Sequence, residues 1–210
     1  MTGERRLRIA PAPPDAIQYR YVQIAHSQGA TKGTEVCMPI EGVLALRDGT
    51  CVKVREIRPD DAPALRRLVG RSSERSIELR FFGPMKELSE ERARRFAEVD
   101  GKDRFALVAL DPEDEGEIVA VVRYEREGST DAAEYAALVE DRFQGRGLGI
   151  GLTRRLIEAA KERGIERLHA LVLRENGRML RLLRSLEFPE RKRRENGLEH
   201  IEIDLRPDAA

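Results

Sequence analysis

A glycine-rich segment between an apolar strand and an amphipathic helix constrains this 210-residue chain more than any other feature. Residues 133–139 form a short apolar run around one carboxylate, Glu134, and predict a β-strand. Residues 144–149 read Q-G-R-G-L-G, and apolar residues then recur at the spacing of one helical face until Gly164 ends the helix. This order of elements places free backbone N–H groups at a helix N-terminus, where they bind anions such as phosphates.

The spacing within this loop narrows the kind of phosphate ligand. No Gly-Lys-Ser/Thr follows, so it is not a Walker loop, and the acidic residue that ends the second strand of a dinucleotide-binding unit is missing. The alternative is a tight turn in which the glycines serve only for packing. Four glycines at a spacing of two exceed what such a turn needs, so we predict a phosphate-binding loop.

The charge balance and the cysteines exclude several other classes. Lys+Arg and Asp+Glu both number 38, so no overall field favours nucleic acid or a membrane surface. No apolar run has the length of a signal peptide or a membrane span. Cys37 and Cys51 lack metal-ligand spacing, and the three histidines do not cluster with other ligands. We predict a reduced, cytoplasmic protein without nucleic-acid, membrane or metal partners.

The remaining pattern predicts one α/β domain with a mixed sheet flanked by helices. Residues 1–42, which contain three helix-breaking prolines, are predicted to be a partly ordered N-terminal extension, and residues 43–207 the folded domain. Its first element is a hairpin over residues 43–57 that turns at Asp48–Gly49. Strands are predicted at residues 105–110, 117–124, 132–139, 167–173 and 198–205, and helices at 62–70, 73–79, 89–99, 148–164 and 176–186.

Three local expectations complete the fold. Asp60 and Ser89 are predicted to cap their helices. The basic residues 191–194, together with Asn196–Gly197, are predicted to form a loop. That basic run is either a solvated turn or a docking site for an acidic patch.

The pattern Q-x-x-G-x-G at Gln144, Gly147 and Gly149 resembles the acyl-coenzyme A pyrophosphate loop of the GCN5-related N-acetyltransferases (GNAT). The resemblance covers about residues 50–205, and the predicted element order is the one that this family implies. Four further segments are similar to bacterial Pat-like protein-lysine acetyltransferases: L-R-D-G-T at 46–50, R-P-D-D at 58–61, R-F-F-G-P at 80–84 and E-N-G-R-M-L at 175–180.

The resemblance implies transfer of an acetyl group from acetyl-CoA to a lysine of a protein, commonly an acyl-CoA synthetase. Two alternatives stay open. One is an N-acetyltransferase for a small amine or amino acid, and the other is a domain that binds or senses acyl-CoA with little turnover.

Glu134 is the candidate general base. Because a lysine ammonium has a pKa near ~10.4, only about one in ~2,500 is neutral at pH 7, and a base must collect its proton. Glu134, Ala136 and Leu138 share one face of the strand, and the protein-acetylating branch of the family places its base at the position of Glu134. The alternative is an exposed glutamate without a task, in which case Glu125 or Glu140 is the next candidate.

The resemblance also implies the coenzyme-binding residues. Backbone amides of residues 144–150 would hold the pyrophosphate, and the strand backbone would pair with the pantetheine arm. The side chains of Arg142 and Arg146 either reach phosphates or are solvated, and Asn176 either contacts the pantetheine arm or only caps its helix. The predicted set is Leu138, Val139, Gln144, Gly145, Arg146, Gly147, Leu148, Gly149, Ile150 and Asn176.

One expected residue of the family is missing. Many members carry a tyrosine as general acid for the coenzyme thiolate, and Leu183 stands at that position here. A thiol with a pKa near ~8.5 can leave as a thiolate, so the loss is compatible with turnover. Tyr124 and Tyr135 are predicted to be packing residues.

Overall fold

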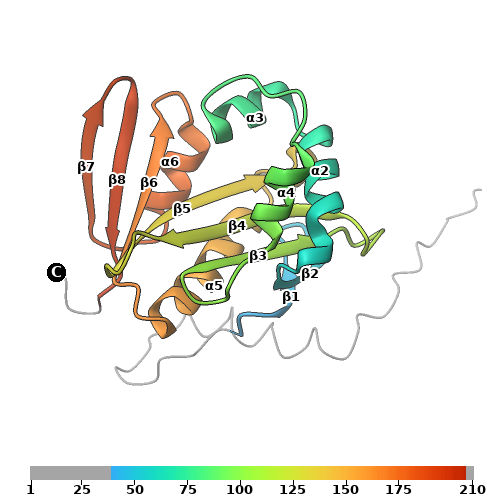
Figure 1. The fold of residues 1–210 in the computed structure, drawn as a ribbon, viewed down its shortest axis with the longest axis horizontal. Coiled ribbons are helices and arrows are strands. Elements are labelled where there is room, and N and C mark those ends of the chain that lie inside the picture. Colours follow the sequence, from blue (N-terminus) through green and yellow to red (C-terminus); the bar gives the residue numbers. More distant parts are fainter. Residues whose placement is uncertain (1–38, 207–210) are drawn as a thin grey trace, which may run out of the picture. The chain divides into compact units, whose positions relative to one another are not determined.

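Eight strands form one mixed sheet in the order β1-β2-β3-β4-β5-β6-β8-β7 (Figure 1). The computed structural model describes residues 39–206, so all but the last four residues of the predicted extension 1–42 lie outside the described residues, as do His26 and Cys37. The strands are β1 Gly42–Ala45, β2 Cys51–Glu56, β3 Arg104–Leu110, β4 Ile118–Arg126, β5 Ala132–Val139, β6 Arg167–Leu173, β7 Glu190–Glu195 and β8 Leu198–Asp204. Neighbouring strands are antiparallel except β5 and β6, which run parallel.

Helices cover both faces of the sheet. They are η1 Pro59–Asp61, α2 Ala62–Arg71, α3 Glu74–Phe81, α4 Glu90–Ala97, η2 Asp141–Phe143, α5 Leu148–Glu162 and α6 Gly177–Arg184. One core cluster joins α5 and α6 to one face, and a second joins α2, α3 and α4 to the other. The predicted α/β fold with a mixed sheet is confirmed, and each predicted element agrees with the structure within two residues except in the region of β7.

The alternation of side chains along β5 follows the predicted two faces. Tyr135 and Val139 contact the α5 side, whereas Leu138 lies in the cluster beneath α2 and α3. Because successive strand residues point to opposite faces, Glu134 lies on the same face as Leu138. This places the candidate base on the side of the sheet that α3 and α4 cover.

Two of the helix caps are as predicted and one is not. Ser89 accepts the N–H of Arg92 at 3.3 Å and caps α4, and Asn176 caps α6. Asp60 caps nothing among the described residues and is exposed. Its neighbour Asp61 has the local role instead, since its carboxylate accepts the N–H of Arg58 at 2.8 Å and pairs with the Arg55 guanidinium at 2.7 Å.

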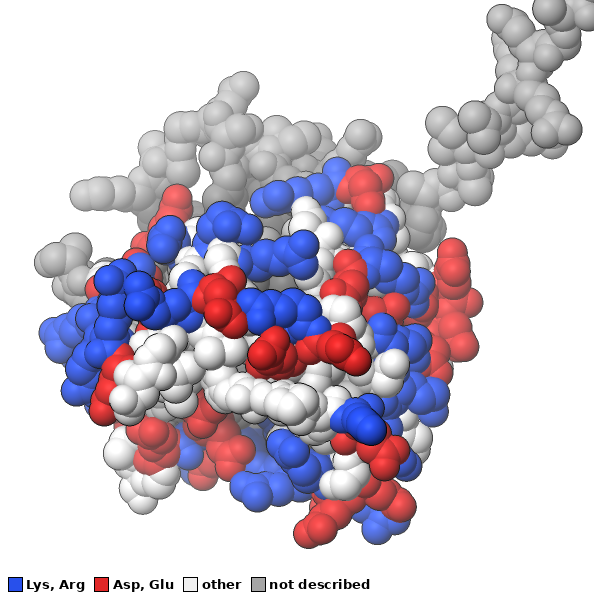
Figure 2. Space-filling model, turned by 90° about the horizontal axis from the view of Figure 1, so that it is seen from above, with Lys and Arg blue, Asp and Glu red and all other residues white. Residues whose placement is uncertain are grey.

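The prediction of a loop at residues 191–194 is wrong. These residues belong to β7, which pairs with β8 along its whole length. All six side chains of β7 are exposed, so no apolar alternation signals a strand. The backbone ladder to β8 forms it, with Asn196 (φ 48°) and Gly197 (φ 79°) making a two-residue hairpin turn. Figure 2 shows lysine and arginine side chains gathered at the left, the side on which Figure 1 shows the β7–β8 hairpin.

The sheet divides between β5 and β6. The two strands pair only at residues 132–134 with 167–169, whereas β4 follows β5 as far as Val139. Residues 135–139 therefore have one backbone edge that no strand of the described chain pairs with. The loop that follows β5 begins at the open end of this division. Within residues 39–206, no helix has the length and apolarity needed to cross a bilayer.

Candidate functional site

A cavity of about 570 Å³ lies where β5 and β6 separate. Residues 134–139 of β5 and 170–172 of β6 line it, together with parts of α3, α6 and the loop after β5. The charged residues in its wall are Arg47, Arg75, Arg80, Arg178, Arg181, Glu134 and Asp141. Five cations against two anions give the cavity a positive field, which suits a ligand that carries several phosphates.

The loop after β5 presents a row of free backbone N–H groups. Gly145 (φ 75°) and Gly147 (φ 93°) turn the chain through backbone conformations that other residues rarely adopt. None of the N–H groups of residues 145–150 donates a hydrogen bond to another described residue, and the first bond of α5 runs from Gly151 N–H to the Gly147 carbonyl at 3.1 Å. Residues 144, 145, 147, 149 and 150 line the cavity. Such a row of amides at a helix N-terminus is an anion site.

The predicted loop residues divide into those that face the cavity and those that hold the loop in place. Leu148 is fully buried in the core, and Arg146 does not line the cavity. The Gln144 side chain donates to the Val139 carbonyl at 2.8 Å and to Ser76 Oγ at 3.0 Å, and it accepts from Arg178. Its amide therefore fastens the loop to β5 and α3.

The side chains of Arg146 and Arg142 are directed away from the cavity. Arg146 donates to Asp48 at 2.5 Å and to Thr50 at 2.6 Å. This hydrogen bond from Arg146, aided by the N–H of Thr50, lowers the pKa of Asp48 to about 2. Arg142 instead pairs with Glu140 and Asp111 on the far side of the loop.

Arg47 is the arginine that faces the loop from the β1–β2 hairpin. It lines the cavity, and a Cβ placed on Gly147 would lie 3.2 Å from the Arg47 Cγ. Its guanidinium makes no ion pair with a described carboxylate. The sequence does not mark Arg47 as a neighbour of the loop, because the loop and the hairpin turn are about one hundred residues apart and meet only in the folded sheet.

A hydrogen-bonded chain connects β5 to the first turn of α5. Thr153 Oγ1 donates to the Gly149 carbonyl at 2.7 Å, so its single proton is used, and Tyr135 must be the donor in the 2.8 Å contact between the two hydroxyls. Burial raises the pKa of Tyr135 to about 12, although the bond to Thr153 acts in the opposite direction. Tyr135 and the fully buried Tyr124 are packing residues, as predicted, and the Tyr135 proton is already donated to Thr153.

Glu134 is the one of the three candidate bases that lines the cavity. Glu140 is buried at 5% exposure and held by Arg71 at 3.1 Å and Arg142 at 2.5 Å. Glu125 lies directly opposite Glu134 on β4 but is outside the cavity wall. Of the three candidate bases, the geometry therefore leaves Glu134, which lies beside the divided strands.

Helix α6 supplies the wall opposite α3. Asn176 lines the cavity while its side chain accepts the N–H of Met179 at 3.1 Å, so the capping role is present. Leu183, the position predicted for a general-acid tyrosine, is 3% exposed in the core and does not line the cavity, whereas Leu182 does. Among the described residues, Tyr135 is the one tyrosine in the cavity wall.

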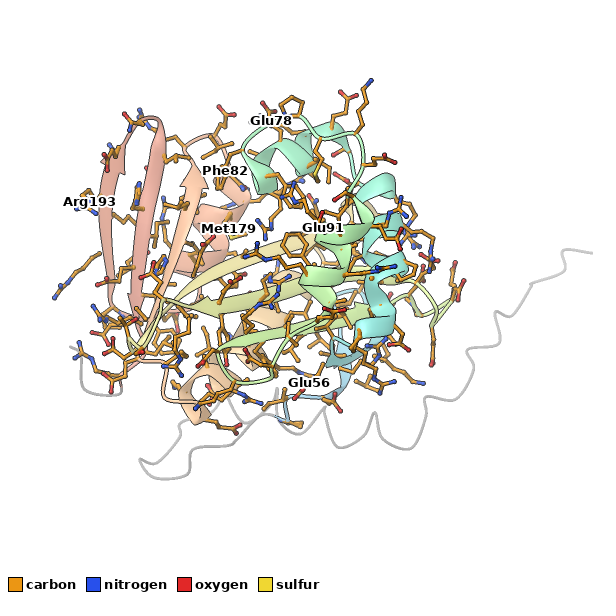
Figure 3. The ribbon with its side chains drawn as sticks, viewed as in Figure 1. Glu56, Glu78, Phe82, Glu91, Met179 and Arg193 are labelled. Carbon is orange, nitrogen blue, oxygen red and sulfur yellow. The ribbon has the colours of Figure 1, made fainter. Side chains whose placement is uncertain are left out.

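Phe82 is a wall residue that sequence reasoning missed. It follows α3 in a left-handed conformation (φ 62°), which is unusual for a bulky side chain, and it is 45% exposed. Phe82 directly after α3 and Met179 on α6 both line the cavity, and both are labelled in Figure 3. An exposed aromatic residue in the R-F-F-G-P segment was the available signal. Within residues 39–206, no cluster of His, Cys, Asp or Glu is arranged to hold a metal ion.

Comparisons with known proteins agree on one family. The model of the acetyltransferase (GNAT) family matches residues 73–188, more than half of the chain. Acetyltransferase PA5475 of Pseudomonas aeruginosa is 32% identical over 148 residues, which are 70% of this chain and 79% of that protein. Acetyltransferase Pat of Mycolicibacterium smegmatis is 32% identical over 62% of this chain, and the match spans only 43% of that longer protein.

Two solved structures extend the comparison. The GNAT domain of S. lividans PAT has a TM-score of 0.73 and 36% identity, over 80% of this chain and 99% of that domain. The yncA acetyltransferase of Salmonella typhimurium, solved with its cofactor acetyl-CoA, has a TM-score of 0.60 at 20% identity, over 76% and 96% of the two chains. The second likeness shows the shared fold.

Proposed function

Because this chain belongs to the GNAT family of acetyltransferases and acts with acetyl-CoA, we propose that it transfers the acetyl group to a lysine side chain of a protein. The observation that carries the proposal is one cavity that joins a row of free loop amides to Glu134 along the same strand, β5. The similarity to the GNAT domain of S. lividans PAT and to M. smegmatis Pat favours a protein acceptor. On this proposal residues 43–207 form the catalytic domain of a cytoplasmic enzyme.

The coenzyme would lie along the division of the sheet. The free amides of residues 145–150 suit its pyrophosphate, and Arg47 supplies a cation beside Gly147. The unpaired backbone edge at Leu138 and Val139 suits the pantetheine arm as an added strand. Asn176 borders the same channel, and its amide nitrogen stays available after capping.

Glu134 would act as the general base. The lysine must lose one proton before its nitrogen attacks the acetyl carbon, and Glu134 accepts that proton directly or through a water. The C–N bond then forms while the C–S bond breaks, coenzyme A leaves as a thiolate, and the second proton of the attacking nitrogen passes to water or to this thiolate. The Tyr135 proton is held by Thr153, so the proposal assigns no general acid to Tyr135.

The mouth of the cavity supports an acceptor with an aliphatic arm. Phe82 and Met179 are apolar wall residues from facing elements, so they can contact the methylene groups of a lysine as it approaches Glu134. A lysine side chain has an apolar stem that ends in an amine. Its stem would contact Phe82 and Met179 while its amine reaches Glu134.

Mass spectrometry of lysine acetylation tests the proposal. The purified full chain is incubated with acetyl-CoA and a host lysate, and the thiol released is measured in parallel with amino acids and polyamines. We expect new acetyl-lysine sites that depend on the enzyme and are absent with Glu134→Gln. Acetylation of small amines without any protein site would contradict the protein acceptor but keep the acetyltransferase. Coenzyme binding without turnover on either class would indicate a sensing domain.

A further inference from the structure

Among the described residues, three arginines on the Glu134 side of the sheet have no carboxylate partner in an ion pair. Arg80 lies in the last turn of α3, Arg92 is on α4 and Arg123 is on β4. Within residues 39–206, none of the three makes an ion pair.

Arg123 is the most deeply placed of them. It is only 7% exposed, and its Nη2 has no hydrogen-bond partner within residues 39–206, while its Nη1 donates to the Phe96 carbonyl at 3.3 Å. Burial, followed by the neighbouring cations Arg80 and Arg104, lowers the pKa of Arg123 to about 10. A buried guanidinium without a counter-ion is costly unless an anion joins it.

The strand register places Arg123 on the face of Glu134. Arg123 lies opposite Ala136 of β5, which lines the cavity, and Glu125 lies opposite Glu134. Residues directly opposite in a ladder share a face, so all four side chains point towards α3 and α4. Glu125 pairs with Arg95 at 3.8 Å and Arg104 at 4.0 Å, and its charge offsets only part of what burial and the neighbouring cations do to Arg123.

Arg80 and Arg92 are held by aromatic rings rather than by carboxylates. Arg80 lies 5.0 Å and Arg92 5.6 Å from the centre of the Phe81 ring, and Arg92 and Arg123 lie over the Phe96 ring at 5.8 and 4.7 Å. Ring contacts orient a guanidinium and leave its N–H groups free to bind. Of the three, Arg80 lines the cavity together with Glu134.

Glu134 alone does not account for three cations. Burial lowers the pKa of Arg80, and Glu134 acts against this effect, so the two are electrostatic neighbours. Yet no residue in the described part of the chain forms an ion pair with Glu134, and as a base it must receive a proton during each turnover. A cation locked to it would weaken that role. The cluster therefore has capacity for one further anion at the acceptor end of the cavity.

We propose that the cluster of Arg80, Arg92 and Arg123 binds a carboxylate carried by the acceptor close to its reacting amine, with Arg80 making the direct contact. Guanidinium groups bind carboxylates through paired, charge-assisted hydrogen bonds. On the proposed function, on which this inference rests, the carboxylate is an Asp or Glu side chain near the target lysine. In a free amino acid, the same chemistry comes from the α-carboxylate.

Paired peptides test the subsite. Each peptide is blocked at both ends and has one lysine, with a single Glu at one position from three before to three after it, and its partner carries Gln there. Nα-acetyl-lysine and its amide form a further pair with and without a carboxylate. The kinetics use the full chain as wild type, Arg80→Gln and Arg80→Lys, with Arg94→Gln as a matched control on the outer surface of α4, where Arg94 pairs with Glu90.

For the wild type we expect at least one Glu peptide to have a KM about tenfold below that of its Gln partner, as one charge-assisted contact gives, with little change in kcat. Arg80→Gln should reduce this preference to within about twofold, Arg80→Lys should keep part of it, and Arg94→Gln should keep all of it. Acetyl-CoA affinity should stay within about twofold in all four proteins, because the backbone amides of the loop, and not Arg80, hold the pyrophosphate.

Two results overturn the subsite: equal KM values for Glu and Gln peptides at every position, or a preference that persists in Arg80→Gln. A changed pH profile of kcat in Arg80→Gln, with the Glu preference intact, would show that Arg80 only supports Glu134. If no peptide is acetylated but small amines are, the protein-acceptor proposal fails, and the pair of lysine derivatives then decides the subsite separately.

Discussion

At the scale of single residues, chemistry depends on which carboxylate reaches the cavity. Glu134, Glu125 and Glu140 are all glutamates in or near β4 and β5. In the structure, however, Glu140 is bound by two arginines and Glu125 is outside the cavity wall. Strand periodicity could predict the face of Glu134, because period two is a local property. It could not predict Arg47, Arg80 or Arg123, whose positions depend on contacts between distant elements.

Glu134→Gln should lower kcat by about 10²–10⁴, the usual contribution of a general base, because it keeps the shape and removes proton acceptance. Acetyl-CoA affinity should stay within about twofold, since the loop amides hold the pyrophosphate independently. In the wild type, kcat/KM should rise towards alkaline pH, because a deprotonated base and a neutral lysine are both needed. Glu125→Gln, on the neighbouring strand, is the control.

Steady-state and single-turnover rates at saturating acetyl-CoA measure this effect. Near-normal turnover of Glu134→Gln would remove the residue as base. A loss in Glu125→Gln of the same size as in Glu134→Gln would point to a general disturbance of the paired strands instead.

At the scale of elements, the loop after β5 and the β1–β2 hairpin act together. The sequence could predict the loop, because its glycines and the following helix are contiguous. It could not predict that the hairpin turn covers the loop, with Asp48 bound to Arg146 and Arg47 beside Gly147. The segment L-R-D-G-T predicts a turn. The structure adds that this turn contacts the loop through Asp48 and Arg47.

Gly147→Asp should weaken acetyl-CoA binding by at least about 1.4 kcal/mol, a tenfold change in Kd, because it adds a negative charge beside the row of free amides. The φ of 93° at Gly147 strains any side chain there, so Gly147→Ala measures the strain and the contact with Arg47 without the charge. Calorimetry on both variants separates the two effects. Unchanged affinity of a folded Gly147→Asp would exclude the loop from the site.

Asp48 should make stability depend on pH through its bond to Arg146. Its folded pKa of about 2 lies below the ordinary value, so its contribution is fully present above the unfolded pKa of about 3.9 and is lost as pH falls towards 2. The urea midpoint of the wild type should exceed that of Asp48→Asn at pH 6, and the two should converge near pH 2. In an Arg146→Gln background, Asp48→Asn should change the urea midpoint equally at pH 6 and pH 2, because the charged partner is gone. A difference between the wild type and Asp48→Asn that is independent of pH would exclude the ionic origin.

At the scale of the whole molecule, the sequence pattern predicts the fold but not the edge strand β7. Apolar alternation or helical periodicity marks nearly every element, because each buries a face against one of two cores. Strand β7 buries nothing, so its sequence E-R-K-R-R-E has no such pattern, and only the Asn196–Gly197 turn signalled a hairpin. Charged edge strands resist pairing with other chains, which gives this composition a structural reason.

The division between β5 and β6 leads to the prediction for the molecule as a whole. The two strands share only three paired positions, so a coenzyme that fills the cavity adds contacts between the two parts of the sheet. A ligand that binds only the folded state at 100 times its Kd stabilises it by about 2.7 kcal/mol, which for a chain of this size raises Tm by roughly 5–10 °C. Acetyl-CoA should produce this shift in the wild type and in Glu134→Gln alike, whereas Gly147→Asp should show about half of it or less at the same concentration. Differential scanning calorimetry with and without acetyl-CoA measures all three.

A Tm shift that is lost in Glu134→Gln would mean that the carboxylate binds the coenzyme instead of accepting the acceptor's proton. An equal shift in Gly147→Asp would place the coenzyme-binding site away from the loop.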